Sequence, residues 1–162
     1  MLKFLNKKKD NKGFSLVELI IVVAIMAILV GLLAPQYIKY VEKSRKSADA
    51  SNLSEMVNAV QIYAADADPG LPEGDYTITI SDEKTEITGP STTIKVDGEE
   101  KSGEDLVKAA VAETAPDYAS TKMKSSKWED NLIANIHIDD NGGTKVTYTP
   151  VKLQEFINNK TK

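Results

Sequence analysis

The sequence predicts an α+β protein in which one long N-terminal helix packs on a small antiparallel β-sheet. Residues 15–66 contain no proline except Pro35, and the apolar residues of their second half recur at helical spacing. Beyond residue 66, short segments rich in β-branched residues alternate with turn sequences. The chain has no cysteine, which excludes disulfides, zinc sites built on thiolates and a cysteine nucleophile.

The first half of the long helix is apolar enough to cross a membrane. No charged residue occurs from Leu19 to Ile38, and a membrane span needs roughly 20 apolar residues. We therefore predict a transmembrane segment at residues 14–38. Glu18 lies near the start of this run, where a charge in hydrocarbon costs about 2.5–3.5 kcal/mol on insertion scales. Such a carboxylate is a candidate functional group that needs a partner.

Two weak helix formers, Gly31 and Pro35, predict a hinge inside this helix. Pro35 has no N–H to donate to the carbonyl of Gly31, so one helical hydrogen bond is lost. A kink with easy local unwinding is one interpretation, and a simple bend forced by Pro35 is the other.

The helix changes character after Tyr40. Between residues 42 and 52 the only apolar residues are Ala48 and Ala50, which predicts a water-exposed collar with i,i+4 ion pairs between Glu42 and Lys46 and between Arg45 and Asp49. An apolar stripe follows and should carry a globular head. Its members are Leu53, Met56, Val57, Val60, Tyr63, Ala64 and Ala67. We therefore expect residues 14–52 to protrude and residues 53–162 to form the head.

The head should contain about four antiparallel strands and two short helices. Residues 68–74 are a loop by composition, residues 102–105 resemble a capping box before a helix ending at Ala115-Pro116, and residues 118–127 are a polar loop. A final helix is expected from Pro150, as its first residue, to Ile157. The strands are predicted at residues 76–80, 92–96, 132–138 and 144–148, the last two joined by a turn at residues 140–143.

Nothing in the head indicates catalysis. His137 is the only histidine, and it lies between two isoleucines as a polar-face strand residue does. We therefore expect no enzyme activity and no cofactor. Asp139, Asp140 and Asn141 could offer oxygen ligands to calcium, but the same residues make a good hairpin turn, so a metal is the weaker interpretation.

Charge argues against nucleic acid as a partner. From Leu53 onward the chain holds 11 basic and 20 acidic residues, whereas nucleic-acid binding needs a basic surface. The one basic and aromatic patch of the head, Lys122, Lys124, Lys127 and Trp128, is more simply a surface loop than a DNA contact.

The N-terminus allows three interpretations. Its first thirteen residues hold five lysines and Asp10. A secretory signal peptide is disfavoured by the length of the apolar run, by Glu18 and by the lack of an A-x-A site. A plain signal anchor explains everything except Glu18. The third interpretation comes from Lys12-Gly13-Phe14-Ser15-Leu16-Val17-Glu18, which resembles the class III signal of type IV prepilins through about residue 45.

This resemblance implies a pilin fold and a defined processing route. A membrane aspartyl peptidase would remove the leader, residues 1–13, by cutting between Gly13 and Phe14, and Phe14 would then be N-methylated. Phe14 and Glu18 would act in assembly, where Glu18 would pair with the N-terminal amine of a neighbouring subunit. The precursor would cross the cytoplasmic membrane once, and the product would be a homo-oligomeric helical filament at the cell surface, built by a pilus assembly platform.

The function so implied is that of a structural pilus subunit serving adhesion, surface (twitching) motility or aggregation. The absence of cysteine and the lysine-rich leader favour a major pilin of Gram-positive type. Three alternatives stay open at this point: a pseudopilin of a type II secretion-like system, a DNA-binding competence pilin and a membrane-anchored enzyme.

Overall fold

The computed structural model describes residues 13–66 and 70–160 of the 162-residue chain. The chain divides into two compact units, Met1–Tyr40 and Val41–Lys162. Helix α1 (Leu16–Asp66) belongs to both units, which confirms the predicted long helix almost to the residue. The lysines of the expected leader lie outside the described residues.

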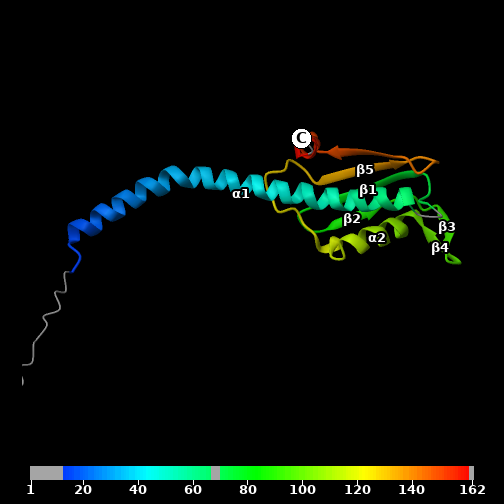
Figure 1. Cartoon of the computed structure of the whole chain (residues 1–162), viewed down its shortest axis with the longest axis horizontal. Helices are drawn as coiled ribbons and strands as arrows, with labels where there is room; N and C mark the ends of the chain where they lie inside the picture. Colours follow the sequence, from blue (N-terminus) through cyan, green and yellow to red (C-terminus); the bar gives the residue numbers. More distant parts are fainter. Residues whose placement is uncertain (1–12, 67–69, 161–162) are drawn as a thin grey trace, which may run out of the picture. The chain divides into compact units, whose positions relative to one another are not determined.

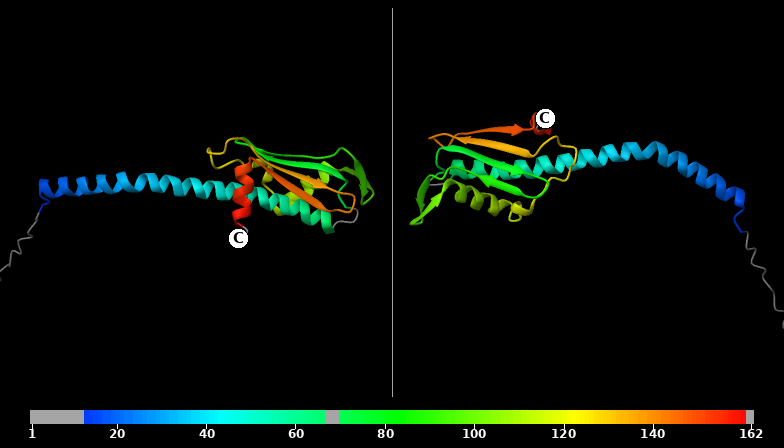
Figure 2. Two further views of the ribbon diagram at one scale, coloured as in Figure 1. Left: turned by 90° about the horizontal axis from the view of Figure 1, so that it is seen from above. Right: turned by 180° about the vertical axis from the view of Figure 1, so that it is seen from behind.

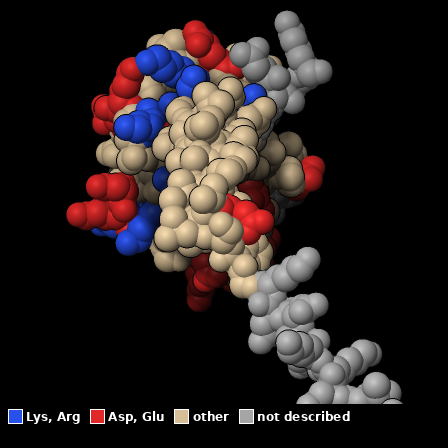
Figure 3. Space-filling model, turned by 90° about the vertical axis from the view of Figure 1, so that its left-hand side faces the viewer, with Lys and Arg blue, Asp and Glu red and all other residues tan. Residues whose placement is uncertain are grey.

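In its described residues, 13–40, the first unit is a largely apolar helical segment with exposed side chains. Large apolar residues from Phe14 to Tyr40 are all exposed, and Phe14 is 87% exposed. Among the described residues, α1 is the one helix long and apolar enough to cross a membrane. Figure 3 shows the uncharged surface of this segment end-on. The helix continues through Gly31 and Pro35, so the predicted hinge there stays a prediction.

The second unit is built on a four-stranded antiparallel sheet. Its strands are β1 (Gly74–Ile80), β2 (Thr85–Thr88), β5 (Leu132–Ile138) and β6 (Thr144–Thr149), in the order β2-β1-β5-β6. Ile78 lies opposite Ile87 of β2 and Ala134 of β5, so the apolar faces of the central strands coincide. The sequence predicted β1, β5 and β6 because each alternates β-branched residues over five or more positions.

The fourth strand was predicted incorrectly. Residues 92–96 were expected in the main sheet, but β3 (Thr93–Val96) pairs with β4 (Glu99–Ser102) in a separate hairpin. Asp97 and Gly98 both have positive φ, 52° and 86°, as a two-residue hairpin turn requires. The true edge strand, β2, is only four residues long, and its alternation of buried and exposed positions is too short to be read from the sequence.

Two helices cover one face of the sheet. The C-terminal half of α1 and helix α2 (Gly103–Thr114) both lie there in the views of Figures 1 and 2. The predicted cap of α2 is confirmed, because the Asp105 N–H donates to the Ser102 hydroxyl over 3.1 Å. The predicted α1 stripe supplies buried Leu53, Met56, Val57, Val60 and Ala64, whereas Tyr63 is partly buried and Ala67 lies outside the described residues.

The C-terminal helix α3 (Val151–Lys160) begins one residue later than expected. Pro150 precedes the helix, and its carbonyl accepts the Leu153 N–H over 2.8 Å. Leu153 is fully buried and attaches α3 to the core. Residues 118–120 form a short 3-10 turn (η1, Tyr118–Ser120) inside the stretch predicted to be a loop.

Tyr76 makes the stability of the second unit sensitive to alkaline pH. Its side chain is fully buried against Gly89 and Gly103, and its hydroxyl donates to the Pro72 carbonyl over 2.8 Å. Burial disfavours the phenolate and raises the pKa of Tyr76 to about 12, from 10 for an exposed tyrosine. Burial also raises the pKa of Tyr148.

We expect the free energy of unfolding to fall as pH rises from 10 to 12. In that window the unfolded chain releases the phenolic proton while the folded chain keeps it, so stability is full below pH 10 and is lost above it. Urea unfolding of residues 41–162 between pH 8 and 11.5 measures this. Tyr76→Phe should cost about 1 kcal/mol at pH 8 and show a shallower alkaline decline. Equal slopes for the two proteins would contradict the assignment to Tyr76.

Candidate functional site

A capping box starts helix α1. The Ser15 hydroxyl accepts the Val17 N–H over 3.3 Å, and the Glu18 carboxylate accepts the Ser15 N–H over 2.8 Å. The Ser15 carbonyl accepts the first helical hydrogen bond, from the Leu19 N–H, over 3.2 Å. Two of the otherwise unpaired donors at the helix start are satisfied reciprocally in this way. Sequence reasoning missed this role of Ser15, although Ser-x-x-Glu before an apolar run is its usual signal.

The expected cleavage residues lie just outside the cap. Gly13 and Phe14 precede the helix and are exposed, and no atom approaches within 4 Å of where a Cβ on Gly13 would lie. The cap therefore separates two kinds of backbone, with Gly13 to Ser15 non-helical and Leu16 onward helical. Glu18 and Phe14, the two predicted assembly residues, lie within one turn of this boundary.

Glu18 is engaged on one side only. Its Oε2 atom accepts the Ser15 N–H, and the described residues provide no cation within ion-pair distance. The negative charge of Glu18 is therefore not neutralised by a cation of the described residues, while the cap fixes the position of the carboxylate. This arrangement suits an acceptor that meets a cation from outside the chain.

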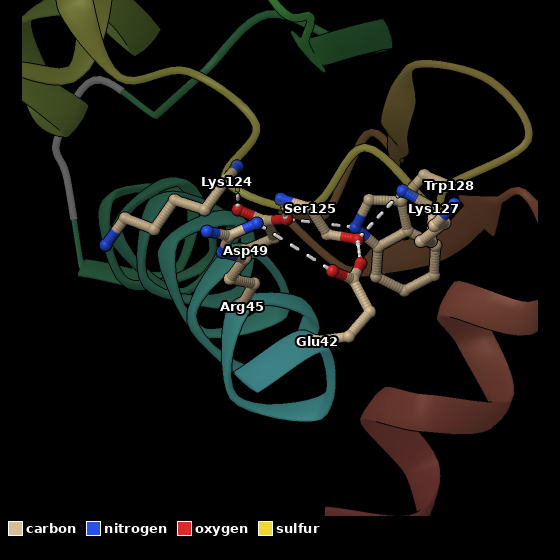
Figure 4. Close-up of polar contacts among 7 residues, drawn as sticks. All are labelled: Glu42, Arg45, Asp49, Lys124, Ser125, Lys127 and Trp128. Atoms are coloured by element: carbon tan, nitrogen blue, oxygen red, sulfur yellow. Dashed lines mark hydrogen bonds and ion pairs between the residues drawn. The ribbon is translucent and has the colours of Figure 1, made fainter. Parts of the chain in front are cut away.

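A second polar site, which we call the Asp49 clasp, occurs where the water-exposed collar was expected. It consists of Asp49, Lys124, Ser125 and Trp128 (Figure 4). The carboxylate of Asp49 is 1% exposed and accepts the backbone N–H groups of Lys124 and Ser125 over 2.7 and 3.0 Å. It also accepts the indole N–H of Trp128 over 3.0 Å. The prediction of an exposed collar was wrong here.

Further residues of α1 and one residue of α3 contact the residues of the Asp49 clasp. Glu42 accepts a hydrogen bond from the Ser125 hydroxyl and lies 4.0 Å from Arg45, so the expected i,i+4 pairs give way to an i,i+3 pair and a loop contact. The Lys46 ammonium lies 4.5 Å from the centroid of the Trp128 ring. Phe156 of α3 meets the same ring edge-on, with the centroids 6.4 Å apart. Polar residues of α1 thus hold loop 121–131, and Trp128 of this loop contacts α3.

The other candidate residues have structural partners. Asp139 accepts the N–H groups of Asn141 and Gly143 over 2.9 and 2.7 Å, so its carboxylate closes the hairpin turn. Within residues 13–66 and 70–160, no group of three or more potential metal-ligating side chains is found. His137 lies on the exposed face of β5, with its Nδ1 atom 2.8 Å from Asp75. Lys122, Lys124 and Lys127 are exposed on loop 121–131.

Comparison with known proteins gives two partial matches to the chain. Residues 8–34 match the family model of the prokaryotic N-terminal methylation motif. The type IV major pilin protein PilA of Myxococcus xanthus (strain DK1622) is 38% identical over 58 residues, which cover 36% of this chain and 26% of that protein. The chain thus matches about a quarter of the length of this relative. No solved structure matches the chain.

The methylation motif overlaps the start of helix α1. The motif, residues 8–34, includes the capping box and most of the exposed apolar segment of α1. The similarity to a major pilin covers a longer stretch than the motif itself. This chain therefore carries the prokaryotic N-terminal methylation motif at the start of a long apolar helix, and it is similar over 58 residues to a type IV major pilin.

Proposed function

We propose that this protein is the precursor of a structural subunit of a type IV pilus. A membrane peptidase cuts between Gly13 and Phe14, Phe14 is N-methylated, and the mature chain polymerises into a helical filament at the cell surface. The observation that carries the proposal is a carboxylate, Glu18, at the capped start of α1, where an exposed apolar segment matches the N-terminal methylation motif.

The exposed apolar surface supports polymerisation. In the precursor the bilayer covers residues 14–38, and in the filament the same surface is buried against the helices of other subunits. Each large aliphatic side chain that is fully buried contributes about 1.5–3 kcal/mol. The exposed residues concerned include Leu19, Ile20, Ile21, Val23, Ile25, Met26, Ile28, Leu29, Val30, Leu32 and Leu33. A bundle of such helices is therefore strongly cohesive.

Apolar packing alone does not fix the position of one helix along its neighbour, and pairing by Glu18 would fix it. Cleavage creates a new amine at Phe14, and the Glu18 carboxylate of an adjacent subunit pairs with it. An ion pair is much stronger in a bundle of low dielectric than in water. The partners implied are further copies of this chain, the prepilin peptidase and the assembly platform. We propose a structural role with no catalysis by this chain.

A pseudopilin is the second candidate, because it would carry the same signal and helix. Electron microscopy of cells decides between the two, since a pilin gives long surface fibres and a pseudopilin gives none under native expression. A competence pilin would need the exposed lysines of loop 121–131. Replacing Lys122, Lys124 and Lys127 with alanine would then abolish DNA uptake while fibres persist.

The N-terminal mass of protein sheared from the cell surface tests the proposal directly. We expect a chain that begins at methylated Phe14. A surface protein that still carried Met1, or material found only in the membrane fraction, would refute it.

Substitution of Gly13 by a bulky residue should leave the precursor uncut. Gly13 has no side chain to obstruct the scissile peptide bond, whereas a leucine there adds one next to the attacked carbonyl. Mass spectrometry of membranes from Gly13→Leu cells should therefore find the full-length chain, and fibres should be absent. Gly13→Ala is the matched control, with the smallest possible side chain. A mature chain beginning at methylated Phe14 in Gly13→Leu cells would place the cleavage determinant elsewhere.

A further inference from the structure

We propose that the Ser15–Glu18 capping box keeps the scissile Gly13–Phe14 bond out of helix α1 and thereby makes it cleavable. This inference rests on the proposed processing between Gly13 and Phe14. Ser15 acts here as a positioning residue, because it controls the conformation of the bond and contributes nothing to the chemistry of its hydrolysis.

The hydrogen bond between Val17 and Ser15 is the central observation. In a continuous helix each N–H donates to the carbonyl four residues earlier, so the Val17 N–H would donate to the carbonyl of Gly13. That carbonyl is the one attacked during cleavage between Gly13 and Phe14. In the structure the Ser15 hydroxyl accepts this N–H instead, over 3.3 Å. The hydroxyl therefore occupies the donor that would otherwise draw the scissile carbonyl into the helix.

Glu18 occupies a second donor, two residues before Val17. Its carboxylate accepts the Ser15 N–H over 2.8 Å, which a longer helix would direct to the carbonyl of residue 11. Two of the donors that could extend the helix over the scissile bond, the N–H groups of Ser15 and Val17, are thus satisfied by side chains of the cap. The result is the observed boundary, with Gly13 and Phe14 exposed and non-helical.

Near the membrane, the Ser15 hydroxyl and the Gly13 carbonyl compete more strongly for the Val17 N–H. Backbone donors in a medium poor in water need a protein partner, so an uncapped Val17 N–H would take the Gly13 carbonyl. Proteases cut exposed, irregular chain far more readily than hydrogen-bonded helix. Cleavage itself adds one water across the amide, which leaves a carboxylate on Gly13 and an amine on Phe14. An extended Gly13–Phe14 bond presents its carbonyl to that water in the peptidase site.

The test is the initial rate at which prepilin peptidase cuts the full-length precursor in detergent. Ser15→Ala removes the acceptor for the Val17 N–H, and we expect cleavage to slow by about fivefold, the usual effect of losing a serine N-cap. Ser15→Thr and Ser15→Asn keep an acceptor at the same place and should be cut within about twofold of wild type. Glu18→Gln also keeps the box and should be cut normally.

Amide NMR of the isotope-labelled precursor in micelles supplies a readout independent of the peptidase. In Ser15→Ala, the Val17 amide should exchange more slowly with solvent, and the Gly13 carbonyl carbon should shift toward its helical value. Ser15→Thr should match wild type in both the exchange rate of the Val17 amide and the chemical shift of the Gly13 carbonyl carbon.

Each other outcome has a definite meaning. The inference is overturned if Ser15→Ala is cut at the wild-type rate, or if the Gly13 carbonyl carbon of this variant keeps its wild-type chemical shift. Equal slowing of the alanine, threonine and asparagine variants also overturns it, because it shows direct recognition of the serine. A wild-type precursor that the peptidase does not cut at all would instead defeat the proposed function, while the NMR comparison would still report on the cap.

Discussion

Replacing Glu18 with glutamine should reduce the yield of surface fibres by at least about tenfold while the precursor is still processed. Glutamine keeps an oxygen that accepts the Ser15 N–H, so the start of α1 is preserved. It lacks the negative charge, so under the proposed pairing the amine of the adjacent subunit would be left buried and unpaired. Breaking one side of a buried ion pair costs about 3–5 kcal/mol, which each subunit added to the filament would lose.

Fibre yield is measured in the sheared surface fraction and by electron microscopy, with processing followed by mass spectrometry. Glu18→Ala removes the charge and half of the cap, and it should lose fibres at least as completely. Glu55→Gln is the matched control, because Glu55 is an exposed carboxylate farther along α1. Normal fibre yield from Glu18→Gln would falsify the pairing role and leave only the capping role for this residue.

Replacing Asp49 with alanine should lower the free energy of unfolding of residues 41–162 by about 3–5 kcal/mol. The carboxylate accepts three hydrogen bonds, from two backbone amides of loop 121–131 and from the Trp128 indole. Alanine leaves these donors without an acceptor at a site where Asp49 is 1% exposed and Ser125 is 2% exposed. A small domain has a total stability of only about 5–15 kcal/mol, so much of the population could unfold.

Urea unfolding followed by circular dichroism measures this loss. Residues 41–162 form one of the two compact units of the chain and contain all of its buried core, so they are a suitable fragment. Asp49→Asn keeps one carboxamide oxygen and should lose about half as much stability. Glu55→Ala, an exposed site on the same helix, should change it by less than about 0.5 kcal/mol. A loss below 1 kcal/mol in Asp49→Ala would show that water replaces the carboxylate without cost.

The elements that depend on local pattern were predictable from the sequence. Helix α1 follows from an apolar run and then an apolar stripe without strong breakers, and the pairing of β5 with β6 follows from two β-branched segments around a turn. Strands β2 and β4 were missed because each is four residues long and carries charged residues, so neither shows a full apolar alternation.

The two polar sites differ in how far they could be predicted. Glu18 could be singled out as a candidate because a single charge in an apolar run is conspicuous, although the cap it forms with Ser15 was overlooked. The Asp49 clasp could not be found, since its donors lie 75 to 79 residues away and come from a loop without regular structure. From sequence alone, a polar stretch of helix is predicted to be exposed to solvent unless the loop that covers it is known.

Trp128 is the only tryptophan of the chain, and its place in the Asp49 clasp gives the protein an internal optical reporter. The indole contacts Lys46, Asp49 and Phe156 at once. Its fluorescence will therefore register the detachment of loop 121–131 from α1, even where the sheet beneath remains intact. Local opening of the Asp49 clasp can thus be followed by emission spectra without any added dye.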